Sequence, residues 1–253
     1  MQGQFLTDRG RIRVQNEDAG GTFYNKANQL LAVIADGMGG HQAGEVASKM
    51  ATNSLKEKWE ESEKINSPEQ AENWLRETVN EINQSIYQSA VETKEYDGMG
   101  TTIVITICTY EFITIAHIGD SRCYLFSNDG FKQVTEDHSL VNELIRAGQL
   151  SEDEAHLYPR QNVLVKALGT EEQVSADIQT IGWEKGNKIL LCSDGLTNKL
   201  SADEISDFIH ANKNMKEIGQ DMIHLANERG GEDNISLVII FRDPVTKAGE
   251  SSC

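Results

Sequence analysis

The most constraining feature of this chain is an apolar run that ends abruptly in a carboxylate, glycines and a histidine, at residues 30–41 (LLAVIADGMGGH). Such a run is typical of a strand with both faces buried. Asp36 ends the run at the mouth of a core, where a charge is costly unless something pairs with it. Gly37 and the glycines after it allow the backbone to bend and to bring a carbonyl close to whatever the carboxylate holds.

A second stretch repeats this design at residues 189–195 (ILLCSDG), where Asp194 follows an apolar run. Each of the two buried strands ends in Asp-Gly, and two such carboxylates at the edge of one core predict a cation that both of them bind. Asp129-Gly130 provides an internal comparison, because strand-like runs flank it on both sides and predict a hairpin turn. At Asp36 and Asp194 no strand returns at once, so metal ligation is favoured there over a plain turn, which stays the alternative.

Composition limits the classes of protein to which the chain can belong. Its 253 residues predict one large domain with a sizeable core, and a net charge of −17 argues against nucleic acid or an anionic membrane as a partner. No signal peptide precedes the first strand-like segment, and no apolar run is long enough to span a bilayer, so membrane insertion is not expected. Cys108, Cys123 and Cys192 lie in apolar runs without zinc-ligand spacing, which suits a reducing cytoplasm.

Strand-like and helix-like segments follow one another in groups. An amphipathic helix is expected after His41, to about Trp59, and a second helix from the N-cap Ser67 and Pro68, with Gln70 completing a capping box. Two further helices carry capping signals at Ser201 and Asn214. Runs of strands with helices gathered in pairs predict packed sheets covered by helices, an α+β arrangement. We expect one domain over residues 1–243, with an exposed flap at about 139–160 and a flexible tail at 244–253.

Four carboxylates lie beside glycines at expected strand ends: Asp36, Asp120, Asp194 and Asp233. If they converged without a cation, their charges would repel one another and raise their pKa values. Mg²⁺ and Mn²⁺ prefer such hard oxygen ligands, and two of these cations about 3.5–4 Å apart can activate a water and clamp a phosphoryl group.

Two further residues are candidates for catalysis. Arg13 is either a surface cation paired with a neighbouring acid or a fork that grips a phosphate, and the sequence favours neither. His41 lies five residues after Asp36, close enough to act as a general acid on a leaving oxygen, although loop histidines are more often solvated or structural.

The ordered motifs resemble the PP2C-type (PPM) protein serine/threonine phosphatases over residues 1–241. The resemblance is carried by Arg13-x-x-Asn16-Glu17-Asp18, Ala35–His41, Gly100-Thr101-Thr102, Gly119-Asp120-Ser121-Arg122, Thr135-x-Asp137-His138-Ser139, Ser193-Asp194-Gly195 and Asp233-Asn234-Ile235-Ser236. It implies a central β-sandwich of two antiparallel sheets flanked by antiparallel helix pairs. The compact length is similar to that of the bacterial branch, which often opposes a membrane-anchored Ser/Thr kinase.

The resemblance also implies a role for each site residue and a reaction. The implied reaction is direct attack of a hydroxide, bridged by two Mn²⁺ or Mg²⁺ ions, on a phosphoserine or phosphothreonine ester of a phosphorylated protein, and no phospho-enzyme would form. Arg13 would bind the phosphate and His41 would protonate the leaving oxygen. The implied ligands are Asp36 as the bridge, the Gly37 carbonyl, Asp194, Asp233, Glu17 through water, and Asp120, with Asp194, at a possible third metal. Asp18 matches a motif too, but a structural role is an equal alternative.

Other classes of protein fit the sequence less well. Cys192 is followed by Asn198 and Lys199 where a cysteine-dependent phosphatase needs an arginine, and no P-loop motif is present. The rival hypothesis is a non-catalytic module of the same fold that binds phosphoproteins. That hypothesis predicts the loss of a metal carboxylate, and none of the motif carboxylates is lost.

Overall fold

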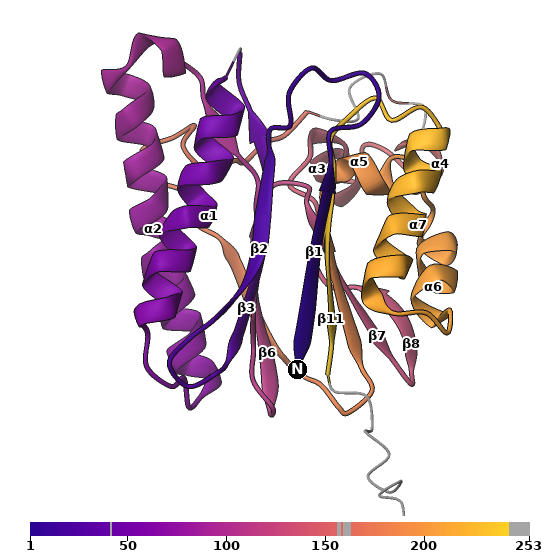
Figure 1. Ribbon diagram of the computed structural model, residues 1–253. Coiled ribbons are helices and arrows are strands. Elements are labelled where there is room, and N and C mark those ends of the chain that lie inside the picture. The colour runs from indigo at the N-terminus through magenta and orange to yellow at the C-terminus, as the bar shows by residue number, and fades with distance from the viewer. Residues whose placement is uncertain (41, 156–157, 159–162, 243–253) are drawn as a thin grey trace, which may run out of the picture.

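Four layers make up the protein: a helix pair, two facing antiparallel sheets and a second helix pair (Figure 1). This arrangement comes from a computed structural model, which describes residues 1–40, 42–155, 158 and 163–242. The layered α+β fold expected from the resemblance is therefore confirmed. The loops and short helices that carry the candidate site lie together at one end of the sandwich, around α3 (Leu140–Arg146) and α5 (Asp194–Thr197).

Each sheet is built from antiparallel neighbours. The order in the first sheet is β1 (Gln2–Asp8), β11 (Ile235–Phe241), β10 (Lys188–Cys192), β7 (Arg122–Ser127) and β8 (Gly130–Gln133). The order in the second is β2 (Asp18–Tyr24), β3 (Leu30–Met38), β5 (Ile103–Cys108), β6 (Phe112–Ile118) and β9 (Asp177–Gly182), and the short β4 (Gly100–Thr101) also pairs with β3. The hairpin expected around Asp129-Gly130 is present as β7 and β8.

Helices cover the outer face of each sheet. The pair α1 (Ala43–Glu61) and α2 (Pro68–Glu92) packs on the second sheet, and the pair α6 (Ala202–His210) and α7 (Met215–Glu228) packs on the first (Figure 1). The shorter helices are η1 (Lys94–Tyr96) and α4 (Glu152–Ala155). No helix among the described residues is both long and apolar enough to cross a membrane.

The apolar run of β3 is explained by the two cores on its two faces. Leu31 and Val33 belong to the core beneath α1 and α2, whereas Leu30, Ala32 and Ile34 belong to the core between the sheets. Because alternate residues of a strand point to opposite faces, a strand buried on both sides needs an unbroken apolar sequence. The prediction that both faces of this strand are buried is confirmed.

Local capping signals place the helix boundaries. Capping boxes at Ser201 with Glu204 and at Asn214 with Glu217 are both complete. Ser67 caps α2 by accepting from the N–H of Gln70, but the Gln70 side chain accepts from the N–H of Asn66 rather than from that of Ser67. The expected tail at 244–253 and residues 156–157 and 159–160 of the expected flap lie outside the described residues.

Candidate metal centre

Asp36 lies inside β3, two residues before its end, whereas the sequence predicted it at the end of the strand. β3 continues because Gly37 and Met38 pair with β4. Gly37 allows the chain to approach its neighbours closely: a Cβ there would lie 2.1 Å from the carbonyl oxygen of Gly44. The backbone around Asp36 is therefore fixed on both sides by strand pairing and by a contact that only glycine permits.

The other three predicted carboxylates arrive from separate elements. Asp194 is the first residue of α5, Asp233 precedes β11, and Asp120 follows β6 after Gly119. Asp194, Asp120 and Asp233 are all close enough to act on the charge of Asp36. The structure thus brings together all four carboxylates that the sequence singled out.

The mutual repulsion expected from the sequence is present. Burial, followed by the charges of Asp18, Asp194, Asp120 and Asp233, raises the pKa of Asp36 well above its ordinary value. Burial and the neighbouring Asp233 raise the pKa of Asp194 as well. A cluster of carboxylates with raised pKa values is a place where bound positive charge is strongly favoured.

Two buried carboxylate oxygens have no hydrogen-bond partner among the described residues, Oδ1 of Asp18 and Oδ1 of Asp194. Buried polar atoms almost always have a partner, so these two oxygens indicate a ligand for the cluster. A set of carboxylate oxygens at one locus suits a hard divalent cation such as Mg²⁺ or Mn²⁺. The residues present therefore fit the metal ions that the resemblance implies.

Hydrogen bonds orient the two carboxylates that carry these free oxygens. Oγ of Ser193 donates to Oδ2 of Asp18 at 2.8 Å and accepts from the N–H of Ser236 at 3.0 Å. Nδ2 of Asn198 donates to Oδ2 of Asp194 at 3.1 Å. In each case one oxygen is held and the other stays available, which is how supporting hydrogen bonds orient a metal ligand. Asp18, paired with Asp36 across β2 and β3, is thus part of the cluster.

Arg13 and Glu17 lie at the edge of the carboxylate cluster. Nη2 of Arg13 donates to Oδ2 of Asp233 at 2.8 Å, and its Nη1 lies 3.8 Å from Oε2 of Glu17. The Arg13 side chain is 45% exposed, so it pairs with the cluster and also faces solvent. Burial raises the pKa of Glu17. His41 lies outside the described residues, and its role as general acid stays a prediction.

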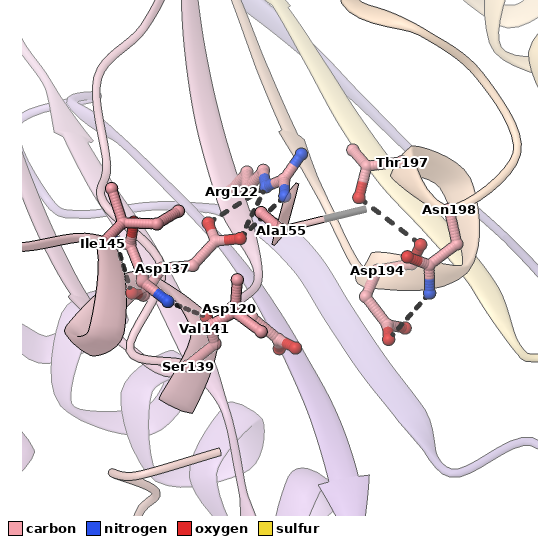
Figure 2. Close-up of a pocket in the computed structure, with 11 residues that line it drawn as sticks. Asp120, Arg122, Asp137, Ser139, Val141, Ile145, Ala155, Asp194, Thr197 and Asn198 are labelled. Atoms are coloured by element: carbon pink, nitrogen blue, oxygen red, sulfur yellow. Dashed lines mark hydrogen bonds and ion pairs between the residues drawn. The ribbon is translucent and has the colours of Figure 1, made fainter. Parts of the chain in front are cut away.

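A pocket of about 400 Å³ opens next to the cluster. Asp120 and Asp194 reach into it from opposite sides, and α3 contributes Val141, Asn142 and Ile145 to its wall (Figure 2). Burial, then Asp194, raises the pKa of Asp120 to about 7. The pocket therefore places the segment expected to act as a flap beside Asp120, the carboxylate expected at a third metal.

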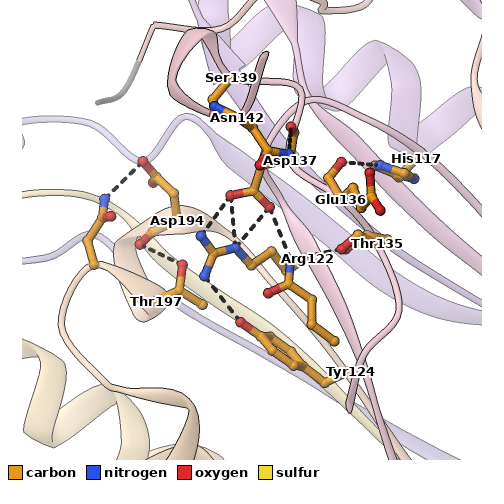
Figure 3. Close-up of polar contacts among 12 residues, drawn as sticks. His117, Arg122, Tyr124, Thr135, Glu136, Asp137, Ser139, Asn142, Asp194 and Thr197 are labelled. Atoms are coloured by element: carbon orange, nitrogen blue, oxygen red, sulfur yellow. Dashed lines mark hydrogen bonds and ion pairs between the residues drawn. The ribbon is translucent and has the colours of Figure 1, made fainter. Parts of the chain in front are cut away.

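An ion pair between Arg122 and Asp137 forms one wall of this pocket, and the sequence predicted no role for either residue. Arg122 donates from Nε to both carboxylate oxygens of Asp137, at 2.9 and 3.0 Å, and from Nη2 to Oδ2 at 2.7 Å (Figure 3). Its Nη1 lies 3.3 Å from the hydroxyl of Tyr124. Both residues belong to motifs quoted for the resemblance, but nothing in either motif indicates that the two motifs face each other.

Comparisons with known proteins agree with this geometry. A profile of the protein phosphatase 2C family matches residues 11–237. The chain belongs to the protein phosphatase 2C family. It is 44% identical over 252 residues to the serine/threonine phosphatase stp of Listeria monocytogenes, with 100% of both chains covered.

Solved structures of this family have the same fold. Stp1 of Staphylococcus aureus, a serine/threonine phosphatase, superposes with a TM-score of 0.90 at 40% identity and covers 96% of this chain and 95% of its own. The catalytic domain of the serine/threonine phosphatase PstP, solved with two manganese ions, superposes with a TM-score of 0.81 at 29% identity, covering 94% of this chain and 96% of its own. The predictions of the family, of a phosphatase and of an enzyme are confirmed.

Proposed function

We propose that this phosphatase hydrolyses phosphoserine and phosphothreonine esters of proteins at the carboxylate cluster. The observation that carries the proposal is the convergence of Asp36, Asp194 and Asp233, together with the buried oxygens of Asp18 and Asp194 that have no hydrogen-bond partner within the part of the chain that the structure describes. The proposed ligands of two Mn²⁺ or Mg²⁺ ions are Asp36, the Gly37 carbonyl, Asp194, Asp233 and, through water, Glu17. Asp120, with Asp194, is the proposed ligand pair for a third ion. Bound divalent cations supply an activated water and stabilise charge on a phosphoryl group.

Arg13 is proposed to bind the phosphate of the substrate. Its guanidinium combines a planar set of N–H donors with an exposed fraction of 45%, so a phosphate arriving from solvent can reach it. Asp233 accepts from Nη2, and Oε2 of Glu17 lies 3.8 Å from Nη1, beyond hydrogen-bond distance. The charge of Arg13 also offsets the negative potential that the carboxylates present to an incoming phosphate.

His41 is proposed to protonate the leaving serine or threonine oxygen. Support comes from its place in the sequence, directly after Gly40, which follows the strand that carries Asp36. An imidazole near its ordinary pKa can hold and release a proton at neutral pH, as a general acid must.

The proposed partners are phosphorylated proteins, among them a cognate Ser/Thr kinase and its substrates, in the cytoplasm. The net charge of −17 argues against nucleic-acid partners, because recognition of a nucleic-acid backbone needs a basic surface. We further propose that residues 1–243 form one catalytic unit and that the segment at about 139–160 is a flap that contacts the substrate.

The test is release of phosphate from a phosphothreonine peptide by metal-stripped protein, with and without Mn²⁺. We expect activity that appears with Mn²⁺ and disappears with a chelator. Asp194→Asn should abolish turnover while the protein stays folded, because it removes a ligand and no core volume. Asp129→Asn is the matched control, since Asp129 has the same Asp-Gly context in an exposed hairpin turn. No activity at any Mn²⁺ concentration in folded protein would favour the non-catalytic binding module.

A further inference from the structure

His138 connects the segment before α3 to the turn that carries Asp120. Its N–H donates to the carbonyl of Gly119 at 3.0 Å, and the N–H of Gly119 donates to Nδ1 of the His138 ring at 3.1 Å. Gly119 is therefore held at both its polar groups by one residue that is only 6% exposed. The carbonyl of His138 in turn accepts from the N–H of Val165, on the far side of the expected flap.

Gly119 needs such a clamp because of its own conformation. Its φ of +102° lies in the left-handed region, and a Cβ at this position would lie 2.7 Å from the side chain of Thr102. A residue without a side chain is conformationally free, so the turn cannot be fixed by contacts of Gly119 itself. The direction in which the next residue, Asp120, points is then determined by the hydrogen bonds that hold Gly119.

Contacts on the other side of the ring determine which nitrogen of His138 carries the proton. Because Nδ1 accepts a hydrogen bond, the proton of the neutral ring is on Nε2, which lies 3.4 Å from Oδ2 of Asp177. Lys166 fixes Asp177 by an ion pair of 3.2 Å. The ring of His117 stacks on that of His138, with 4.7 Å between the ring centroids. Nε2 of His117 lies 2.8 Å from the carbonyl oxygen of Glu136 (Figure 3). Burial lowers the pKa of both histidines, which favours the neutral form of each ring.

The same three side chains have the chemistry of metal ligands, but their hydrogen bonds oppose that use. One ligand atom each of His117, His138 and Asp177 lie within 4.8 Å of one another. A histidine that binds a metal through one nitrogen normally donates an N–H from the other. Nδ1 of His138 is an acceptor, so its Nε2 is protonated and offers no lone pair. The arrangement orients a ring and does not suit a cation.

We propose that His138 is a positioning residue for Asp120: through Nδ1 it fixes the Gly119 turn so that the Asp120 carboxylate faces Asp194 across the pocket. This inference rests on the proposed role of Asp120 as a ligand for a divalent cation. Asp177 contributes by holding the ring in the orientation and tautomer that present Nδ1 to Gly119.

Two isosteric variants separate this role from simple packing. His138→Asn retains an acceptor, Oδ1, near the position of Nδ1, whereas His138→Gln places its amide near Nε2 and leaves the N–H of Gly119 without its acceptor. Mn²⁺ binding to the metal-stripped full chain is measured by isothermal titration calorimetry. Comparison of wild type with Asp120→Asn shows which step of Mn²⁺ binding depends on the Asp120 carboxylate. We expect His138→Gln to weaken that step by about tenfold, as lost support of a metal ligand typically does, and His138→Asn to stay within about twofold.

Equal Mn²⁺ binding by wild type and both His138 variants, with an effect of Asp120→Asn, would overturn the positioning role and leave the proposed function intact. Equal weakening in both His138 variants would also overturn it, because the loss would then not depend on the acceptor. If Asp120→Asn does not change Mn²⁺ binding, Asp120 is not a ligand and the inference fails. Mn²⁺-dependent release of phosphate tests the proposed function separately. If His138→Gln does not fold, Asp177→Ala takes its place: several-fold weakening supports the role, and unchanged binding contradicts it.

Discussion

Replacing Asp137 by asparagine keeps the volume of the side chain and removes the charge that faces Arg122. Two donors converge on Oδ1 of Asp137, Nε of Arg122 at 2.9 Å and Nε2 of Gln133 at 3.2 Å. Oδ2 accepts from Nε and Nη2 of Arg122 at 3.0 and 2.7 Å. Either orientation of an asparagine amide therefore places its NH₂ group against a donor, so at least one charge-assisted bond is lost and one contact becomes repulsive.

The magnitude follows from these contacts. A hydrogen bond to a charged group contributes about 1.5–3 kcal/mol, and removing one partner of a fully buried ion pair costs about 3–5 kcal/mol. The side chain of Arg122 is 31% exposed and that of Asp137 is 16% exposed, so water regains part of the loss. We expect Asp137→Asn to lower the free energy of unfolding by about 2–3 kcal/mol, which corresponds to a Tm lower by about 5–10 °C for a chain of this size.

Guanidinium denaturation followed by circular dichroism measures the change, with thermal unfolding as a second probe. Asp129→Asn is the control, because Asp129 is exposed in the hairpin turn and should change the free energy of unfolding by less than about 0.5 kcal/mol. If Asp137→Asn also lowers the free energy of unfolding by less than about 0.5 kcal/mol, the Arg122–Asp137 ion pair contributes no more than an exposed ion pair does, and the reasoning is wrong.

Three further predictions concern the carboxylate cluster. Ser193→Ala removes the hydrogen bonds that Ser193 makes with a buried oxygen of Asp18 and with the N–H of Ser236, and denaturation should show a loss of about 2–4 kcal/mol; a loss below about 1 kcal/mol would contradict this. Arg13→Lys should lower kcat/KM on a phosphothreonine peptide by about 10–100-fold, because an ammonium cannot bind phosphate as a fork; unchanged kinetics would exclude phosphate binding by Arg13. Burial raises the pKa of Asp18 from 3.8 to about 7, so folded metal-stripped protein binds protons more tightly than unfolded chain, and its Tm should fall as pH rises through that interval; a rising Tm would refute the raised pKa.

Several parts of this fold could be predicted from local sequence. Capping pairs such as Ser201 with Glu204 marked helix starts correctly, because a cap is a contact between residues three positions apart. The unbroken apolar run before Asp36 correctly indicated a strand buried on both faces. The boundary of that strand was less accurate, since pairing with β4 extends it past Asp36, and no signal within the run encodes that distant partner.

The sequence by itself determined the candidate ligands, because each carboxylate and the glycine near it lie within one short segment. It also determined the family, because seven such motifs in the same order are specific to that family. Only the tertiary structure decided which oxygens are held and which stay free, that Asp18 belongs to the cluster, that Arg122 faces Asp137 and that His138 holds Gly119. The physical reason is that these contacts join residues on different strands and loops. Their distances depend on how two sheets pack and on where each loop ends, and no pattern along one segment contains that information.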